Sequence, residues 1–484
     1  MNTATFSLAT LAPAIPEMLL LALACTLLLV DLFLAEDQKH VTYWLSIVSL
    51  VGCAAITAAT IGRPTVVTFQ GMFVADYMSQ VLKVATLLAV AATLVYGRLY
   101  LGVRGMLRGE FLGLSLFATL GMLVMISANH FLTLYLGLEL LALSLYALVA
   151  LERDSARATE AAMKYFVLGA LASGMLLYGM SMLYGATGSL ELNRVAFALE
   201  HARASQTLAA FGLVFIVAGL AFKLGAVPFH MWVPDVYHGA GTPATLLIGA
   251  APKIAAFAFV MRLLAHGLSA MTADWQQMLA ILAVASIGLG NVVAIAQTNL
   301  KRMLAYSTIS HMGFLLLGIL AGTHNGYGSA MFYVITYVLM TLASFGMILL
   351  LSRAGFEAEN LEDFRGLNRR SKWWAFVMLV TVFSLAGIPP AVGFFAKLAV
   401  LQAALEAGYL WVVVFAVLMS VVGAFYYLRI VKLMYMDEPA GEITIAGRLD
   451  ARVLLSANAL AILLLGIVPA SLMELCARAI TASL

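Results

Sequence analysis

The sequence has few charged residues, and this scarcity is its most informative feature. Only 11% of its 484 residues are Asp, Glu, Lys or Arg, while 63% are hydrophobic. Soluble domains carry roughly 25% charged residues, so this chain has too few charges to cover a soluble surface. The composition therefore predicts an all-α integral membrane protein with little room for a soluble domain.

An excess of one charge sign and a cluster of cysteines are also missing. Lys and Arg total 27 against 24 Asp and Glu, a balance that does not favour nucleic-acid binding. Cys25, Cys53 and Cys476 lie far apart and form no CxxC pair, so a protein-bound iron–sulfur cluster is not expected. No HExxH, Walker or strand-associated GxGxxG motif is present, so we expect no metal, nucleotide or NADH site in this chain.

Apolar runs separated by polar residues predict about fourteen membrane spans. The first run, from Ile15 to Ala35, is too long for a signal peptide and follows no basic segment, so we expect it to be retained as a span. The predicted spans are 14–35, 41–61, 73–96, 111–127, 130–150, 159–184, 208–232, 243–265, 275–297, 303–322, 327–352, 373–404, 408–434 and 453–477.

The distribution of Lys and Arg supports this count and gives an orientation. The odd-numbered connections hold 17 of these residues and the opposite side holds 5. Because basic residues concentrate on the cytoplasmic side, both termini are predicted to face the outer compartment. The connection that contains residues 357–372 is then predicted to be cytoplasmic.

Five lysines remain, and all lie inside predicted spans: Lys83, Lys164, Lys223, Lys253 and Lys397. A lysine at the centre of a membrane helix costs about 2.5–3.5 kcal/mol on insertion scales, so such residues are candidates for function. Snorkelling to the membrane surface explains Lys83 and Lys164 equally well, because both are near span ends. It does not fit Lys253, which lies near the middle of its span.

The other ionisable residues favour protons as the transported species. Glu139 is the one carboxylate predicted deep inside a span, and a Na⁺ site needs several oxygen ligands. The protonation of buried Lys and Glu side chains responds to burial and to pairing, so moving a partner changes proton affinity. His230 and His311 are possible relays, whereas His238 and His324 are better explained as polar residues in connections.

Two predicted spans contain internal prolines next to lysines. In FKLGAVPFHMWVPD, Pro228 leaves the carbonyl of Leu224 without its helical partner, beside Lys223. In SLAGIPPAVGFFAK, Pro389 and Pro390 have the same effect two turns before a lysine. Proline kinks often only shape packing, but a kink beside a lysine, twice in one chain, favours a hydrated pathway.

The two broken spans are the seventh and the twelfth, which suggests two repeats of five helices. Repeats with an odd number of spans have opposite orientations, as in many transporters, so the repeats are predicted to be inverted. The predicted units are three N-terminal helices over 1–110, a first repeat over 111–268, a second over 269–436, and a last helix within 437–484.

Three parts of the sequence together resemble the antiporter-like membrane subunits of respiratory complex I. They are FKLGAVPFHMWVPDVYHGAGTPATLLIGAAPKIAAFAF (222–259), the helix around Glu139 and SLAGIPPAVGFFAKL (384–398). The resemblance covers essentially all fourteen spans. Within that family the chain is most similar to members with lysines at the positions of Lys253 and Lys397 and no long lateral helix after the last span.

The resemblance implies roles for the ionisable residues. Glu139 and Lys223 would form an input pair, Lys253 a central relay and Lys397 the outer connection, with Lys164 as a modulator. Protons would enter from the cytoplasmic side near the seventh span and leave outward, driven by quinone reduction elsewhere in the complex.

It also implies the surroundings of the chain. FMN, Fe–S clusters and quinone are expected on partner subunits and no cofactor in this chain. Its neighbours would be other antiporter-like and small membrane subunits in a bacterial inner membrane, with both termini periplasmic. One departure is Gly241 in GAGTP, where GAPTP is expected, and this glycine is predicted to touch no charged site.

Three other functions fit parts of the sequence. A subunit of a multisubunit Na⁺/H⁺ antiporter shares the fold and many of these residues and is the main alternative. A solute transporter is less favoured because the sequence has a single deep carboxylate and no obvious substrate pocket. A purely structural scaffold gives no reason for five lysines inside the membrane.

Overall fold

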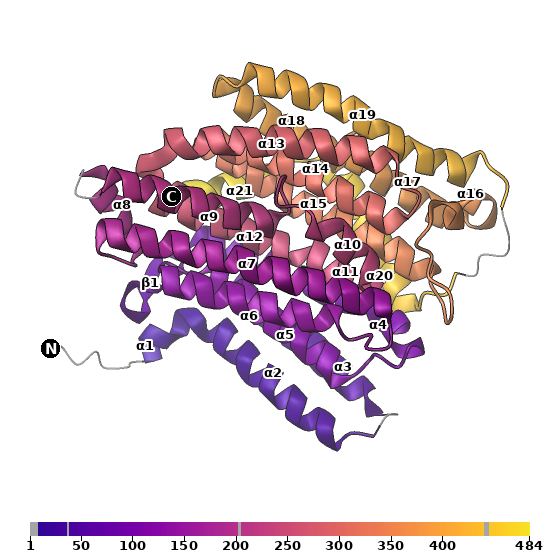
Figure 1. Ribbon diagram of the computed structural model, residues 1–484. Helices are drawn as coiled ribbons and strands as arrows, with labels where there is room; N and C mark the ends of the chain where they lie inside the picture. The colour runs from indigo at the N-terminus through magenta and orange to yellow at the C-terminus, as the bar shows by residue number, and fades with distance from the viewer. Residues whose placement is uncertain (1–7, 36–37, 202–204, 440–444) are drawn as a thin grey trace.

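The computed structural model describes residues 8–35, 38–201, 205–439 and 445–484, and the described chain is almost entirely helical. Its long helices run roughly parallel in a single bundle (Figure 1). Helix α1 and the C-terminus lie at the same end of this bundle, as an even number of crossings requires.

The helices divide at α12 into two groups of similar size. The first group comprises α1 (Leu8–Leu11), α2 (Ile15–Phe33), α3 (His40–Ala58), α4 (Tyr77–Val103), α5 (Gly109–Ile126), α6 (Phe131–Val149), α7 (Ala156–Thr187), α8 (Leu192–Glu200), α9 (Gln206–Leu224), α10 (Trp232–Gly239), α11 (Thr242–Gly249) and α12 (Ala251–Val260). The second group comprises α13 (Thr272–Ile295), α14 (Leu300–Leu320), α15 (His324–Leu351), α16 (Leu367–Arg370), α17 (Lys372–Ala386), α18 (Val392–Glu406), α19 (Leu410–Tyr435), α20 (Leu449–Ile467) and α21 (Ala470–Thr481).

A few shorter elements complete the described chain. Strands β1 (Val66–Thr68) and β2 (Phe73–Ala75) form an antiparallel hairpin in which Val67 is opposite Val74. The single-turn helices are η1 (Ala12–Ala14), η3 (Phe69–Gly71), η5 (Ser269–Met271) and η6 (Leu361–Phe364), and η4 (Met261–Gly267) is a π-helical extension of α12.

The number of membrane crossings agrees with the sequence. Among the described residues, 13 helices are long and apolar enough to span a membrane. The predicted twelfth span, 373–404, supplies the remaining crossing as two shorter helices, α17 and α18, separated by a break. The prediction of about fourteen spans is therefore confirmed, with the twelfth in two parts.

Several predicted span boundaries are wrong. The seventh span was expected to continue to residue 232, but α9 ends at Leu224 because Gly225 adopts a left-handed conformation with φ 81°. The fourteenth span was expected over 453–477, but α20 ends at Ile467 and Pro469 precedes the separate helix α21. Residues 73–75 are not helical, since they belong to the hairpin, and α4 begins behind the N-cap Asp76.

The short joint between α5 and α6 makes them a closely packed antiparallel pair. A Cβ on Gly121 would lie 2.6 Å from the backbone nitrogen of Leu141, and one on Gly137 would lie 2.8 Å from that of Met125. Only glycine allows the two backbones to approach this closely. The pair fixes the position of α6, which carries Glu139.

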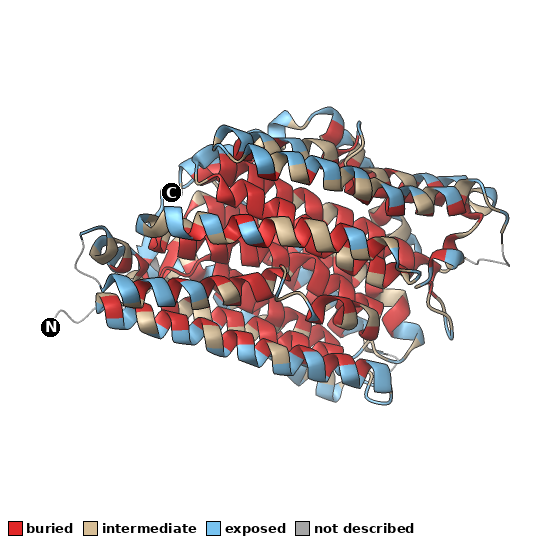
Figure 2. Ribbon diagram, turned by 45° about the horizontal axis from the view of Figure 1, so that its top comes forward, coloured by how far each residue is buried: buried red, intermediate tan, exposed pale blue. Residues whose placement is uncertain are grey.

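Burial increases from the outside of the bundle toward α14 and α15, which are buried on nearly all sides (Figure 2). The outer helices instead expose large apolar side chains, among them Phe33 of α2 and Val421 of α19. An apolar exterior around a well-packed interior is the arrangement expected of a chain surrounded by lipid and membrane partners.

Candidate functional site

The first helix break lies at the C-terminus of α9. Gly225 ends the helix, and the backbone N–H of Ala226 donates back to the carbonyl of Ala221 at 2.8 Å. The last carbonyl, that of Leu224, has no helical partner and accepts a hydrogen bond from Lys253 Nζ of α12 at 2.9 Å. The lysine side chain therefore completes the hydrogen bonding of a helix that ends inside the bundle.

The second break, at the C-terminus of α17, repeats this arrangement. Gly387 has φ 85°, and the N–H of Ile388 donates to the carbonyl of Phe383 at 2.9 Å. The carbonyl of Ala386 accepts a hydrogen bond from Lys397 Nζ at 2.9 Å. The predicted prolines follow the glycines, and the peptide bonds before Pro228 and Pro390 are cis.

The two lysines are balanced by helix ends and not by carboxylates. Within the described residues, neither Lys253 nor Lys397 forms an ion pair. The C-terminus of a helix carries the equivalent of about half a negative charge, which favours a cation at that position. The side chain of Lys253 is only 1% exposed. An ammonium held by carbonyl dipoles can lose its proton without leaving a full opposite charge unpaired.

A small cavity joins Lys253 to Lys223. It has a volume of about 30 Å³ and is also lined by Tyr165 and Trp232. A cavity needs roughly 10–15 Å³ of such volume to hold one water molecule. The cavity, which both lysines line, is therefore large enough to hold water.

Glu139 and Lys223, the input pair that the resemblance implies, make no direct ion pair. No ion pair joins them within 4.0 Å in the described structure. Glu139 Oε1 is buried without a hydrogen-bond partner, although the residue itself is half-buried. Since the two residues lie on separate helices, α6 and α9, sequence spacing could not fix the distance between them.

Lys164 does not lie deep in the bundle. Its side chain is 44% exposed and forms ion pairs with Glu160 at 2.7 Å and Asp235 at 2.8 Å. Asp235 also pairs with Arg302 at 2.9 Å, so it connects α7 and α14 through α10. The sequence did not identify Asp235 as a partner, because it lies 71 residues from Lys164.

The two candidate histidines have different surroundings. His311 of α14 is buried, with Nδ1 2.6 Å from the Tyr333 hydroxyl and Nε2 3.2 Å from the Tyr427 hydroxyl. Ser307 also hydrogen-bonds Tyr427. His230 is half-buried in the segment after the first break, and its Nδ1 has no hydrogen-bond partner. His311 therefore belongs to a buried polar network, whereas His230 does not.

Three buried ion pairs were not predicted from the sequence. Lys83 Nζ lies 2.5 Å from an oxygen of Glu17, so this lysine has a buried partner and does not snorkel. Glu17, near the start of the first predicted span, was not recognised from the sequence as a deeply buried carboxylate. The other two pairs are Asp76–Arg262 at 2.7 Å and Lys301–Glu357 at 3.1 Å.

Glu357 lies outside the spans, and its surroundings shift its pKa. Burial opposes its ionisation, but the Lys301 ammonium and the Thr242 hydroxyl outweigh this effect, so the pKa of Glu357 is lowered. The expectation that Gly241 touches no charged site is wrong. A Cβ at Gly241 would lie 3.6 Å from Glu152 Oε1, and the next residue is the partner of Glu357.

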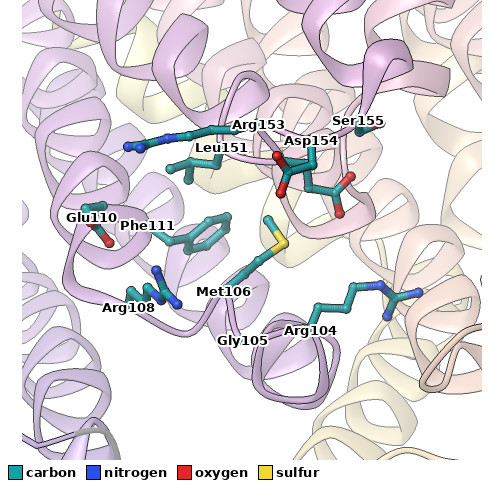
Figure 3. Close-up of a pocket in the computed structure, with 11 residues that line it drawn as sticks. Arg104, Gly105, Met106, Arg108, Glu110, Phe111, Leu151, Arg153, Asp154 and Ser155 are labelled. Carbon is teal, nitrogen blue, oxygen red and sulfur yellow. The ribbon is translucent and has the colours of Figure 1, made fainter.

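A charged surface pocket lies beside this group, at the end of the bundle opposite the termini. Its volume is about 640 Å³, and Arg104, Arg108, Glu110 and Asp154 project around it (Figure 3). Glu152 also lines it. In the part of the chain that the structure describes, no group of three or more His, Cys, Asp or Glu side chains could hold a metal ion.

Comparison with known sequences places these features in a family. Residues 128–423 match the family described as NADH:quinone oxidoreductase/Mrp antiporter, TM. A protein of Thiobacillus denitrificans named NADH-quinone oxidoreductase subunit N is 62% identical over 99% of both chains. A protein of the same name from Nitrosomonas europaea is 59% identical over 99% of this chain and 100% of its own.

Solved structures give the same result for the fold. A chain of respiratory complex I from Thermus thermophilus with bound aureothin has a TM-score of 0.82 and 34% identity, over 96% of this chain and 99% of that one. A chain of the Mrp complex from Dietzia sp. DQ12-45-1b has a TM-score of 0.85 at 21% identity, over 98% of this chain and 97% of that one. At that identity the second likeness shows the fold alone.

Proposed function

This chain belongs to the NADH:quinone oxidoreductase/Mrp antiporter family of membrane proteins, and we propose that it conducts protons as a membrane subunit of a NADH:quinone oxidoreductase. Proton movement would be driven by quinone reduction in other subunits. Its partners are the other membrane subunits of the complex. FMN, Fe–S clusters and quinone are assigned to those partners and no cofactor to this chain.

The observation that carries the proposal is the pair of lysines at the helix breaks. Lys253 and Lys397 each donate to the last carbonyl of a half-helix at 2.9 Å. Each position holds a proton inside the membrane, where a charge without function is costly. Because the partner is a dipole and not a carboxylate, each lysine can release and regain its proton without breaking an ion pair.

We assign the following order to the path. A proton enters near Glu139 and Lys223, crosses the small cavity to Lys253 and continues to Lys397, from which it leaves outward. The segments at Pro228 and at Pro389–Pro390 keep the two half-helices apart. His311 is the better placed of the two histidine relays, because it is hydrogen-bonded within the buried network whereas His230 is not. Lys164 modulates entry through its ion pairs.

The proposed orientation and units follow from the sequence. Both termini would lie on the periplasmic side of a bacterial inner membrane. The inverted repeats would occupy 111–268 and 269–436, between the helices of 1–110 and 437–484. The two breaks support this assignment, because each half-helix ends in a left-handed glycine and its last carbonyl accepts a hydrogen bond from a lysine.

A Na⁺/H⁺ antiporter subunit is the alternative, since the Mrp chain has the same fold. Copurification and transport separate the two functions. In the proposed function, the tagged chain copurifies with FMN and Fe–S centres, and NADH oxidation by the complex in vesicles drives proton uptake that does not require Na⁺. Cation-dependent proton exchange without redox partners would support the antiporter and contradict the proposal.

A further inference from the structure

The structure contains a fully buried lysine, Lys301, that the proposed path does not use. The side chain of Lys301, in the first turn of α14, has an exposure of 0%. Its Nζ donates to the carbonyl of Ala240 at 2.8 Å and lies 3.1 Å from Glu357 Oε1. Lys301 precedes the predicted tenth span, 303–322, and was therefore counted in a connection, but its side chain turns into the bundle.

Glu357 closes the space around this lysine. It belongs to the connection between α15 and α17, and its Oε2 accepts a hydrogen bond from the Tyr100 hydroxyl at 3.1 Å. The Thr242 hydroxyl donates to its Oε1. Arg104 holds the same connection in place by donating to the carbonyl of Phe356 at 3.4 Å. One carboxylate thus joins α4, α11 and α14.

The charged pocket of Figure 3 lies next to the residues that hold this carboxylate, and Glu357 itself does not line it. Arg104 lines the pocket, and so does Glu152. Glu152 Oε1 and the Tyr100 hydroxyl both lie 3.6 Å from the position of a Cβ on Gly241. The pocket therefore ends beside the residues that hold Glu357, on the side that we propose is cytoplasmic.

A line of polar groups leads from Lys301 into the bundle. Lys301, Thr308 and His311 are separated by seven and three residues, so they share one face of α14. Thr308 Oγ1 accepts a hydrogen bond from the Tyr337 hydroxyl at 2.9 Å. The hydroxyl oxygen of Tyr237, on the neighbouring α10, is buried with no hydrogen-bond partner in the described structure. Buried polar atoms of this kind are normally satisfied by water.

The line ends at the second helix break. Lys397 lies on α18, which packs against α14, the helix that carries His311. Lys397 Nζ lies 5.1 Å from the ring centre of Phe314, which follows one turn after His311 on α14. A proton moving along this face would reach the outer lysine without passing Lys223 or Lys253.

From this arrangement we propose that Glu357 and Lys301 form a second cytoplasmic proton entrance, which feeds Lys397 along α14. This inference rests on the proposed function. The Glu357 carboxylate takes up a proton from the side of the pocket, which removes the nearest carboxylate from the Lys301 ammonium and leaves Glu359 at 3.9 Å, itself paired with Arg157. Lys301 then passes its own proton inward, and the protonated Glu357 restores it. One proton enters, one moves on, and the ion pair forms again.

The alternative is that the pair only fastens the connection to the bundle, and a double variant separates the two. Glu357→Gln alone takes the nearest carboxylate from the buried Lys301 ammonium, with Glu359 still 3.9 Å away, and this is expected to weaken assembly. Lys301→Met with Glu357→Gln removes both charges at similar volume, so assembly should recover. An entrance predicts that the assembled double variant still pumps less than the wild type per complex. A pumping rate equal to the wild type would overturn the inference.

A variant deeper in the line keeps the test decisive if the double variant fails to assemble. Thr308→Val changes a hydroxyl to a methyl group and should fold. Thr93→Val is the matched control, since Thr93 is buried on α4 and donates only to its own helix, to the carbonyl of Ala89. The inference predicts slower proton uptake for Thr308→Val than for Thr93→Val, and equal rates would reject it.

Lys253→Met shows whether the inference or the proposed function has failed. If Lys253→Met stops pumping while the Lys301, Glu357 and Thr308 variants pump normally, the second entrance is wrong and the proposed function stands. If all of these variants pump normally, the proton path itself is wrong. Each rate is measured as proton uptake by vesicles that contain the whole complex, divided by complex content.

Discussion

The lysines at the two helix breaks and those at the ends of the bundle are held in different ways. Lys253 and Lys397 donate to backbone carbonyls, whereas Lys83 and Lys301 lie within ion-pair distance of glutamates. Removing a proton from a lysine of the second kind while its glutamate is ionised leaves a buried carboxylate unpaired, which is costly, so Lys301 can pass on a proton only after Glu357 has taken one up. The partner of a buried lysine, more than its depth, therefore indicates whether it exchanges protons freely.

The two breaks also differ from each other. Lys253 reaches its carbonyl from a different span, so the contact ties α12 to α9. Lys397 lies in the second half of the same broken span as its acceptor, Ala386. The first contact depends on how helices pack, while the second is local. We therefore expect substitutions at the first break to alter the packing of more helices than substitutions at the second.

The largest expected difference is between Lys253→Arg and Lys83→Arg. A guanidinium stays protonated and cannot pass on a proton, so Lys253→Arg should lower proton uptake at least about tenfold. Lys83→Arg preserves the charge that pairs with Glu17 and should pump at nearly the wild-type rate. Proton uptake and NADH:quinone activity in vesicles measure both. Equal losses in the two variants would remove the distinction between carbonyl-bound and carboxylate-paired lysines.

The next largest effect concerns stability. Lys83→Met leaves Glu17 buried without its partner, and breaking a buried ion pair costs about 3–5 kcal/mol. Lys83→Met together with Glu17→Gln should restore most of the loss, because neither charge remains. The yield and melting temperature of the purified complex report this. A double variant as unstable as the single one would show that Lys83 acts through more than its pair.

The glycines at the breaks should give smaller and distinguishable effects. An alanine in the left-handed conformation costs roughly 1–2 kcal/mol at either site. A Cβ at Gly225 would lie 2.7 Å from Val233 Cγ2, in a tightly buried region. At Gly387 it would lie 2.9 Å from Lys397 Cδ, which is part of a flexible side chain.

Gly225→Ala should therefore lower the melting temperature more, while Gly387→Ala should displace Lys397 and lower pumping more than stability. Melting curves and proton uptake, measured on the same preparations, test the pair. The reverse order of the two effects would contradict this interpretation of the breaks.

The smallest expected effect is that of Gly241→Pro. The backbone of Gly241 lies at φ −56° and ψ 140°, and Ala240 before it has ψ 151°, both of which suit a proline at 241. Fewer unfolded conformations should stabilise the chain by roughly 0.4–1 kcal/mol. A slightly higher melting temperature with unchanged pumping is expected. A clear loss of pumping would show that this turn must move during turnover.

The sequence predicted the lysines inside the bundle and the breaks because charges and prolines are rare inside membrane helices. Lys253 was identified from its position in an apolar run, and both broken spans from their prolines. Their hydrogen-bond partners could not be predicted. The carbonyl that Lys253 contacts is 29 residues away on another helix, and only packing brings the two together.

Other parts were missed because their local sequence looks ordinary. Lys301 lies next to Arg302, two residues after the N-cap Asn299, where the sequence resembles a connection. Glu17 and Glu357 lie beside span ends, where carboxylates are common, and nothing in the spacing reveals that each faces a buried lysine. The break before α21 was overlooked because the apolar run continues past Pro469.

A proton path through Lys253 is tested most directly by NADH-driven proton uptake in vesicles that contain the complex with Lys253→Met. Methionine keeps the length and apolar packing of the side chain and removes the group that binds the proton, so the complex should assemble. If protons pass through Lys253, complex content stays normal, proton uptake falls at least about tenfold, and NADH:quinone activity falls with it. Wild-type proton uptake per complex would contradict a proton path through Lys253.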